Sequence, residues 1–245
     1  MIPEAVMDEK DPFAATIPTP TAARPLLGLT VLVIEDSRFA CEAMRLLCLR
    51  SGARIRRADC LRSARRHLQV YRPSVVIVDL GLPDGCGAEL ITELTQTEPR
   101  VDVVLGTSGD LNGEALAQAA GCDGFLTKPI VSLAVFQQTI LANLPAERQP
   151  AGLRELPDEI IHPDLMAFQD DMAHIADVLG GEDNETAIDY AAQFIGGVAR
   201  SAQDTGLEQA ADALAKARAS GASAQNEVSR LASLVQQRLT RKLAI

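Results

Sequence analysis

Short apolar runs alternate with amphipathic segments between residues 29 and 145. The runs TVLVIED at 30–36 and SVVIVDL at 74–80 are typical of parallel strands that are buried on both faces. Three further strands are predicted at 53–57, 101–108 and 123–129, of which the first is short. Helical spacing of apolar residues appears between the strands, at 38–51, 60–71, 87–96, 112–119 and 131–144. This alternation predicts an α/β fold: a five-stranded parallel, doubly wound (flavodoxin-like) sheet covered on both faces.

The pattern changes after residue 145. Residues 146–162 are rich in proline and polar side chains and are predicted to form a linker. Residues 163–245 contain only helical patterns, at about 163–180, 184–202, 204–220 and 223–243. Short connections favour an all-α antiparallel bundle, although two hairpins that complete a bundle only by dimerising would give the same pattern. Residues 1–28, with five prolines, are predicted to be a disordered tail.

Composition narrows the range of partners. Aromatic residues make up 3% of the 245 residues, there is no Trp, and the net charge is −10. These values argue against stacking on single-stranded nucleic acid and against a general nucleic-acid or membrane binder. The N-terminus lacks a signal-peptide pattern, and no apolar run approaches the ~20 residues of a membrane span, so we expect a cytoplasmic protein. Five cysteines without a CxxC pair are expected to be reduced thiols.

Charge is distributed unevenly along the chain. Residues 38–72 contain ten arginines and two acids, net +8, whereas residues 147–189 contain twelve acids and two arginines, net −10. One hypothesis is that these opposite charges guide one segment onto the other, within the chain or across a dimer. The alternative is two separately solvated faces, since exposed ion pairs contribute little each.

Polar residues stand at the carboxyl ends of the predicted strands, where α/β sheets place their sites. Glu35 and Asp36 end the first strand and Asp79 ends the third, so three carboxylates meet at one rim. Like charges this close call for a cation, and Mg²⁺ suits an oxygen-ligand set. Thr107 and Lys128, at the ends of the last two strands, add a hydroxyl and an ammonium. This set suits phosphoryl transfer with Asp79 as the attacking group.

The segments VLVIEDS (31–37), VVIVDLGLPDGCG (75–87), VVLGTS (103–108) and GFLTKP (124–129) together resemble the receiver domain of bacterial two-component response regulators. The resemblance covers residues 29–145 in the order and spacing of that family. It implies that Asp79 accepts the phosphoryl group. It also implies that Mg²⁺ is bound by Asp36 directly, by Glu35 mostly through water, by Asp79 and by the carbonyl of Gly81. The implied phosphodonor is a sensor histidine kinase or a histidine phosphotransfer protein.

The resemblance also implies moving parts. Thr107 matches the hydroxyl residue that swings towards the phosphoryl group, and Lys128 matches the lysine that pairs with it. Phe125 falls at the aromatic switch position, and Pro129 is expected to follow a cis peptide bond.

Two positions depart from common members of the family. Gly81 and Gly109 lack the side chains that often tune hydrolysis of the acyl phosphate.

The C-terminal half has no recognisable enzyme motif, so the chain is expected to catalyse only its own phosphorylation and dephosphorylation. We expect a helical output that binds protein or forms a homodimer. The alternatives are a DNA-binding regulator, an effector enzyme, or a phosphotransfer relay through a histidine of the bundle. The helices weakly resemble a degenerate histidine phosphotransfer bundle, in which Ala191, Ala192 or Gln193 stands where the histidine is expected. His174 is predicted to face solvent.

Overall fold

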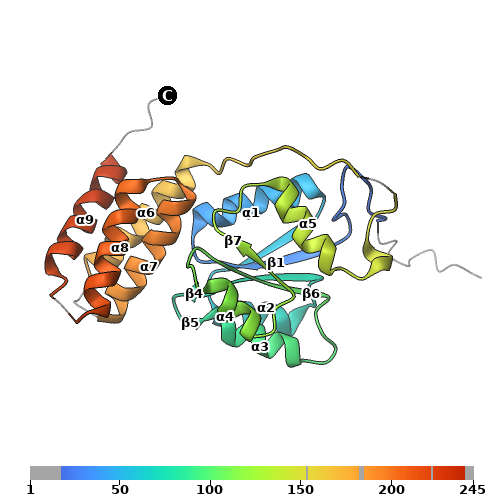
Figure 1. Ribbon diagram of the computed structural model, residues 1–245, viewed down its shortest axis with the longest axis horizontal. Helices are drawn as coiled ribbons and strands as arrows, with labels where there is room; N and C mark the ends of the chain where they lie inside the picture. The colour runs from blue at the N-terminus through green and yellow to red at the C-terminus, as the bar shows by residue number, and fades with distance from the viewer. Residues whose placement is uncertain (1–17, 153, 182–184, 222, 241–245) are drawn as a thin grey trace, which may run out of the picture.

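The computed structural model describes residues 18–152, 154–181, 185–221 and 223–240. An α/β part and a helical part lie side by side, joined by an extended segment that crosses the top of the view in Figure 1. The α/β part contains the acidic rim predicted from the sequence, and the helical part lies against that rim. The arrangement of the two parts therefore decides what can reach the site.

The α/β part is built on five parallel strands in the order β2-β1-β3-β6-β7. This confirms the predicted fold class, and the strands match the predicted segments to within a few residues. A short antiparallel pair, β4 and β5, follows β3 and was not predicted. The strand bounds are β1 Thr30–Ile34, β2 Arg54–Ala58, β3 Val75–Asp79, β4 Gly81–Leu82, β5 Gly85–Cys86, β6 Val103–Ser108 and β7 Gly124–Thr127.

Helices cover both faces of the sheet. Alternate strand residues point to opposite faces, so Val31 and Val33 join one core while Leu32 and Ile34 join the other. Helices α1 and α5 pack on the first face, and α2, α3 and α4 pack on the second. The bounds are α1 Arg38–Ser51, α2 Leu61–Val70, α3 Gly87–Gln96, α4 Gly113–Ala119 and α5 Leu133–Asn143.

The helical part is a four-helix bundle within a single chain (Figure 1). Its core takes side chains from all four helices, among them Ile175, Ile195, Leu214 and Val235, each with no exposed surface. The described residues therefore complete the bundle without a second copy. The bounds are α6 Leu165–Leu179, α7 Glu185–Ser201, α8 Thr205–Ala219 and α9 Gln225–Thr240. The end of the last predicted helix, 241–243, lies outside the described residues.

The predicted N-terminal tail is wrong for its last residues. Leu26 is fully buried in the core beside α1 and α5, and its N–H donates to the carbonyl of Ser51 at 2.9 Å. This anchor could not be predicted, because the leucines at 26, 27 and 29 form too short a run beside Pro25 to show a period. Residues 1–17 of the predicted tail lie outside the described residues.

The predicted linker is also partly packed. Ile161 is 4% exposed, and its N–H donates to the carbonyl of Val131 at 2.8 Å. The linker therefore returns along the start of α5 and fixes the point at which α6 begins.

Candidate functional site

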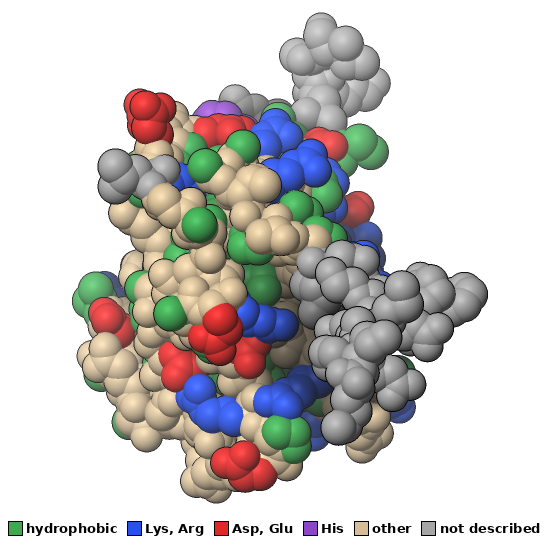
Figure 2. Space-filling model, turned by 90° about the vertical axis from the view of Figure 1, so that its right-hand side faces the viewer, with side chains coloured by type: hydrophobic (Ala, Val, Ile, Leu, Met, Phe, Trp, Pro, Cys, Tyr) green, Lys and Arg blue, Asp and Glu red, His purple; other side chains and the backbone are tan. Residues whose placement is uncertain are grey.

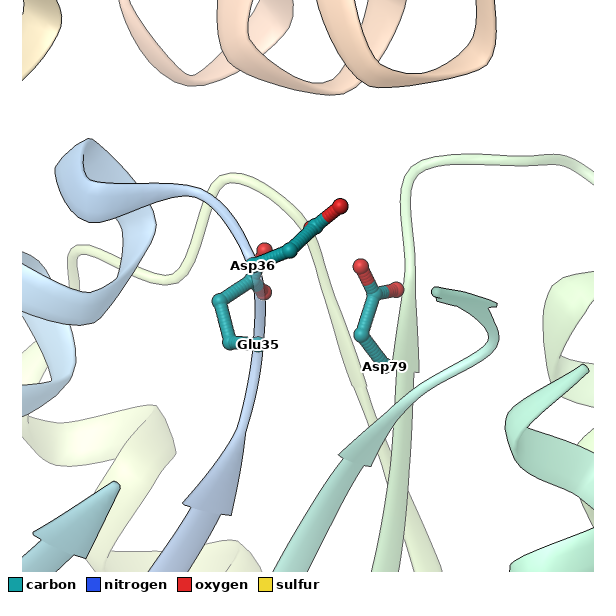
Figure 3. A group of neighbouring side chains, drawn as sticks. All are labelled: Glu35, Asp36 and Asp79. Carbon is teal, nitrogen blue, oxygen red and sulfur yellow. The ribbon is translucent and has the colours of Figure 1, made fainter. Parts of the chain in front are cut away.

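Three carboxylates converge at the carboxyl edge of the sheet (Figure 3). Glu35 and Asp36 directly follow β1, and Asp79 is the last residue of the neighbouring strand β3. One oxygen from each lies within 4.8 Å of the others. Glu35 is 2% exposed and Asp79 6% exposed, so the charges are largely shielded from water. The sheet register thus brings together the residues that the sequence predicted.

The electrostatics of this group favour a cation. Burial, the nearby Asp79 charge and Asp36 raise the pKa of Glu35, although Lys128 opposes the rise. Burial and the Asp79 charge raise the pKa of Asp36 to about 7. Carboxylates whose charged forms are disfavoured by burial and by one another gain most when a hard divalent ion joins them. The donor set, with three carboxylates from two strands, therefore fits Mg²⁺.

Lys128 supplies one positive charge to the site. Its ammonium lies 2.7 Å from Glu35 Oε2 and 2.8 Å from Asp79 Oδ2, and its side chain is 8% exposed. Burial alone would lower the pKa of Lys128, but the two carboxylates raise it well above the ordinary value. The peptide bond before Pro129 is cis, as expected. Lys128 thus places a positive charge beside Asp79 Oδ2.

Two residues predicted to act at the site lie just beside it. Thr107 pairs with Asp79 in the sheet register, but its hydroxyl donates to the carbonyl of Leu126 at 2.7 Å. Phe125 is partly buried against the core under α4. The hydroxyl therefore points into the space between β6 and β7 rather than to the carboxylates. The expected coupling of Thr107 and Phe125 remains a prediction.

A helical segment lies above the carboxylates in Figure 3. Residues from the middle to the C-terminal end of α7, between Gln193 and Ser201, line the cavity there. Tyr190 donates its hydroxyl hydrogen to Asp36 Oδ2 at 2.7 Å, and His174 Nε2 lies 3.2 Å from the same hydroxyl. Gln193 lies against Gly81, and Arg200 lies over Gly109. A small cavity of about 30 Å³ remains between α7 and the carboxylates. The helical part therefore covers the Asp79 carboxylate.

Asp171 joins the two parts of the molecule. This α6 carboxylate is 1% exposed and accepts hydrogen bonds from the Ser37 hydroxyl (2.7 Å), the Arg38 N–H (2.8 Å) and the Phe39 N–H (3.0 Å). It thereby satisfies the free donors at the N-terminus of α1, where a negative charge is also favoured by the helix dipole. Burial raises the pKa of Asp171, and these three hydrogen bonds oppose the rise.

The basic and acidic segments do meet, but through few ion pairs. Arg38 lies 2.8 Å from Asp170, and Arg50 lies 2.8 Å from Glu159. All four of these side chains are at least 42% exposed. Such pairs contribute about 0–1 kcal/mol each. The buried Asp171 carboxylate, rather than the wider charge pattern, is the specific contact.

Comparison with known proteins shows what the α/β part is. Residues 31–140 match the family model "Response regulator receiver domain". Residues 31–140 are a response regulator receiver domain. This confirms the resemblance noted in the sequence, and the fold agrees with it. The receiver occupies less than half of the chain, and the family model stops before the helical bundle.

Individual proteins and solved structures that are similar to parts of this chain are also known. The transcriptional regulatory protein KdpE of Escherichia coli is 32% identical over 99 residues, which are 40% of this chain and 44% of KdpE. KdpE of Mycobacterium tuberculosis is 31% identical over 144 residues, 58% of this chain and 61% of that protein. A crystal structure of a putative response regulator from Chloroflexus aurantiacus has a TM-score of 0.43 and 25% identity, and covers 46% of this chain and 98% of that one. The matches span less than two thirds of either KdpE.

The sequence predicts the site residues of the receiver but not those of the bundle. Glu35, Asp36, Asp79, Gly81 and Lys128 all line the cavity. Four further side chains at or beside the site come from bundle segments without a motif: Asp171, Tyr190, Gln193 and Arg200. The only sequence signal was the loose resemblance of α7 to a phosphotransfer helix, which placed residues 191–193 where a histidine is expected.

Proposed function

We propose that this chain is a response regulator whose receiver is phosphorylated on Asp79 and whose helical bundle is the output. The observation that carries the proposal is the position of Asp79, whose carboxylate lies beside two further carboxylates and is bound to Lys128 at 2.8 Å. When bound, Mg²⁺ would neutralise charge on the phosphoryl oxygens. Glu35, Asp36, Asp79 and the Gly81 carbonyl are the groups that would hold it.

The chain's own residues have separable tasks in this proposal. Asp79 is the nucleophile, because its carboxylate ends a rigid central strand and opens into the cavity. Lys128 holds the acceptor oxygen before transfer and a phosphoryl oxygen after it. The Thr107 hydroxyl would exchange the Leu126 carbonyl for a phosphoryl oxygen, and Phe125 would move with it. The bundle limits how much water reaches Asp79.

The test is phosphorylation of the full chain with acetyl phosphate and Mg²⁺. We expect covalent label on the wild type and none on Asp79→Asn, because an amide cannot form the acyl phosphate. Asp59→Asn, a change at an exposed carboxylate beyond the end of β2, is the matched control and should label normally. Equal label on wild type and Asp79→Asn would contradict the proposal. Acid-labile, base-stable label would assign the phosphoryl group to a histidine.

Magnesium should also stabilise the fold. A ligand that binds only the folded state at 100 times its dissociation constant adds about 2.7 kcal/mol. We expect Mg²⁺ to raise the melting temperature of the wild type at pH 8. Asp36→Asn should abolish that shift because it removes a ligand oxygen, whereas Asp59→Asn should retain it. Thermal denaturation with MgCl₂ or EDTA measures both. An undiminished shift in Asp36→Asn would remove Asp36 from the ligand set.

For the output, we propose protein interaction through the bundle rather than nucleic-acid binding. The two KdpE relatives are named as transcriptional regulatory proteins, but the chain spans less than two thirds of either, and the family model ends before the bundle. On the face seen in Figure 2, described basic side chains are interspersed with acidic ones instead of forming one continuous basic surface. None of the described helices is long and apolar enough to cross a membrane. The cytoplasmic location and a histidine kinase or phosphotransfer protein as donor belong to this proposal.

A further inference from the structure

Two glycines beside the proposed acceptor leave space that α7 fills. An ideal Cβ on Gly81, two residues after Asp79, would lie 2.8 Å from the carboxamide carbon of Gln193. An ideal Cβ on Gly109 would lie 2.6 Å from Arg200 Nε. The helical domain therefore places polar side chains at the two points where the receiver itself has none.

The face of α7 that meets the receiver combines long side chains with a gap. Gln193 and Arg200 are seven residues apart and so share a helix face, and Gly197 lies between them. A Cβ on Gly197 would meet nothing within 4 Å. All three residues line the cavity of about 30 Å³ that also contains Asp79 and Lys128. A water molecule needs roughly 10–15 Å³ by this measure. The cavity therefore has room for water beside the Gln193 amide.

Arg200, which lines the same cavity, has a guanidinium nitrogen without a hydrogen-bond partner among the described residues. Its Nε is buried and has no hydrogen-bond partner among the described residues. Its nearest carboxylates, Asp110 and Asp212, lie 3.5 Å and 3.8 Å from the guanidinium and are 56% and 51% exposed. Phosphorylated Asp79 would carry about −1.5 to −2 charges in place of the single carboxylate charge, and it would present three strong acceptor oxygens. An anion in the cavity would give this guanidinium a partner.

We propose that α7 is a built-in phosphatase element: Gln193 orients the water that hydrolyses phosphorylated Asp79, and Arg200 binds the departing phosphate. The proposal rests on the proposed phosphorylation of Asp79. Phosphoryl transfer depends mainly on positioning and charge stabilisation, and a carboxamide that orients the attacking water is an established solution. An amide can accept a hydrogen bond from that water with its oxygen and donate to a phosphoryl oxygen with its nitrogen.

The reaction balances without a co-reactant other than water. The water oxygen forms a bond to phosphorus, and the bond between phosphorus and the Asp79 carboxylate oxygen breaks. The bonding electron pair returns to Asp79 as its carboxylate charge. Dihydrogen phosphate leaves with both protons of the water. Lys128 again pairs with the free carboxylate, as it does in this structure.

The experiment measures the decay of phosphorylated full chain after acetyl phosphate has been removed by desalting. Loss of one positioned polar group at a reacting centre typically slows a step by about 100- to 1000-fold. We expect Gln193→Ala to lengthen the half-life of the phosphorylated chain at least tenfold. Gln193→Asn keeps the amide on a shorter side chain, so its half-life should lie between those of the wild type and Gln193→Ala. Gln236→Ala, at an exposed glutamine of α9, should decay like wild type. Equal melting temperatures for all variants exclude unfolding as the cause.

The outcomes separate this proposal from its rivals. If Gln193 only obstructs phosphodonors, Gln193→Ala will label faster but decay at the wild-type rate, and the proposal fails. If the phosphoryl group moves to His174, the label on the wild type will become acid-labile as Asp79 loses it, whereas the label on His174→Ala will stay base-labile. That result would overturn the proposal. If wild type takes no label at all, the proposed phosphorylation of Asp79 fails first. A long half-life in wild type and in Gln193→Ala alike also overturns the phosphatase role.

Discussion

Asp171→Ala should release the helical bundle from the receiver. The carboxylate accepts three hydrogen bonds at the N-terminus of α1 and is almost completely buried. Hydrogen bonds to a charged group contribute about 1.5–3 kcal/mol each, and burial of that charge offsets part of this. We therefore expect the domain contact to weaken by about 2–4 kcal/mol. The receiver core should survive, because in the released state water can bind the freed N–H groups.

The release can be measured by amide hydrogen exchange at Arg38 and Phe39. A loss of 2 kcal/mol corresponds to roughly 30-fold faster exchange through opening of the contact. Asp170→Ala is the matched control, because it changes the preceding residue. Asp170 forms an ion pair with Arg38 in which each side chain is more than half exposed. The substitution should alter exchange little. Equal protection in Asp171→Ala and wild type would show that other contacts hold the bundle in place.

Release should also change the chemistry at Asp79. The bundle leaves only about 30 Å³ above the carboxylates, so an open molecule should accept acetyl phosphate faster than a closed one. Under the phosphatase proposal the same variant should lose phosphate more slowly, because Gln193 moves away with α7. The two rates would then change in opposite directions, which a purely obstructive bundle would not produce.

The receiver could be predicted from the sequence because local patterns determine it. The buried strands β1 and β3 can be predicted because each is a run rich in β-branched residues. The carboxyl ends of parallel strands lie at one edge of the sheet, and this brings Glu35, Asp36 and Asp79 together. The burial of Leu26 could not be predicted, because the short leucine run at 26–29 shows no period. Leu165, the first residue of α6, is 55% exposed, because the core of the bundle begins about one turn later in this helix.

The bundle side of the site could not be predicted because it depends on how two domains dock. Asp171 and Asp170 are adjacent acids of the same type in the sequence, yet one is 1% exposed and the other is in an exposed ion pair. Charge totals identified the two segments that meet, but they did not select the contact. Likewise, the sequence placed Gln193 only among three residues at the expected histidine position, and its contact with Gly81 depends on how α7 docks on the receiver.

Lys128→Met should destabilise the fold and almost stop phosphorylation. Methionine keeps the unbranched stem, but it removes the only ammonium that pairs with Glu35 and Asp79 in the described structure. Removing one partner of a buried ion pair typically costs 3–5 kcal/mol, so we expect the free energy of unfolding to fall by about 3 kcal/mol at pH 8 without Mg²⁺. The rate of phosphorylation should fall by about 100-fold or more, because the charge on the transferring group loses its partner.

The pH dependence of that loss tests its cause. Burial already raises the pKa of Glu35, and without the ammonium, which lowers it, the pKa rises further. A carboxyl with a raised folded pKa favours its protonated form in the folded state, so the penalty grows as pH rises through that pKa and shrinks at pH 5. Denaturant unfolding at pH 5 and pH 8 measures this. Lys216→Met, at an exposed lysine of α8, is the control that should change neither value. A loss of the same size at both pH values would instead indicate lost packing, because the packing of the lysine stem does not depend on pH.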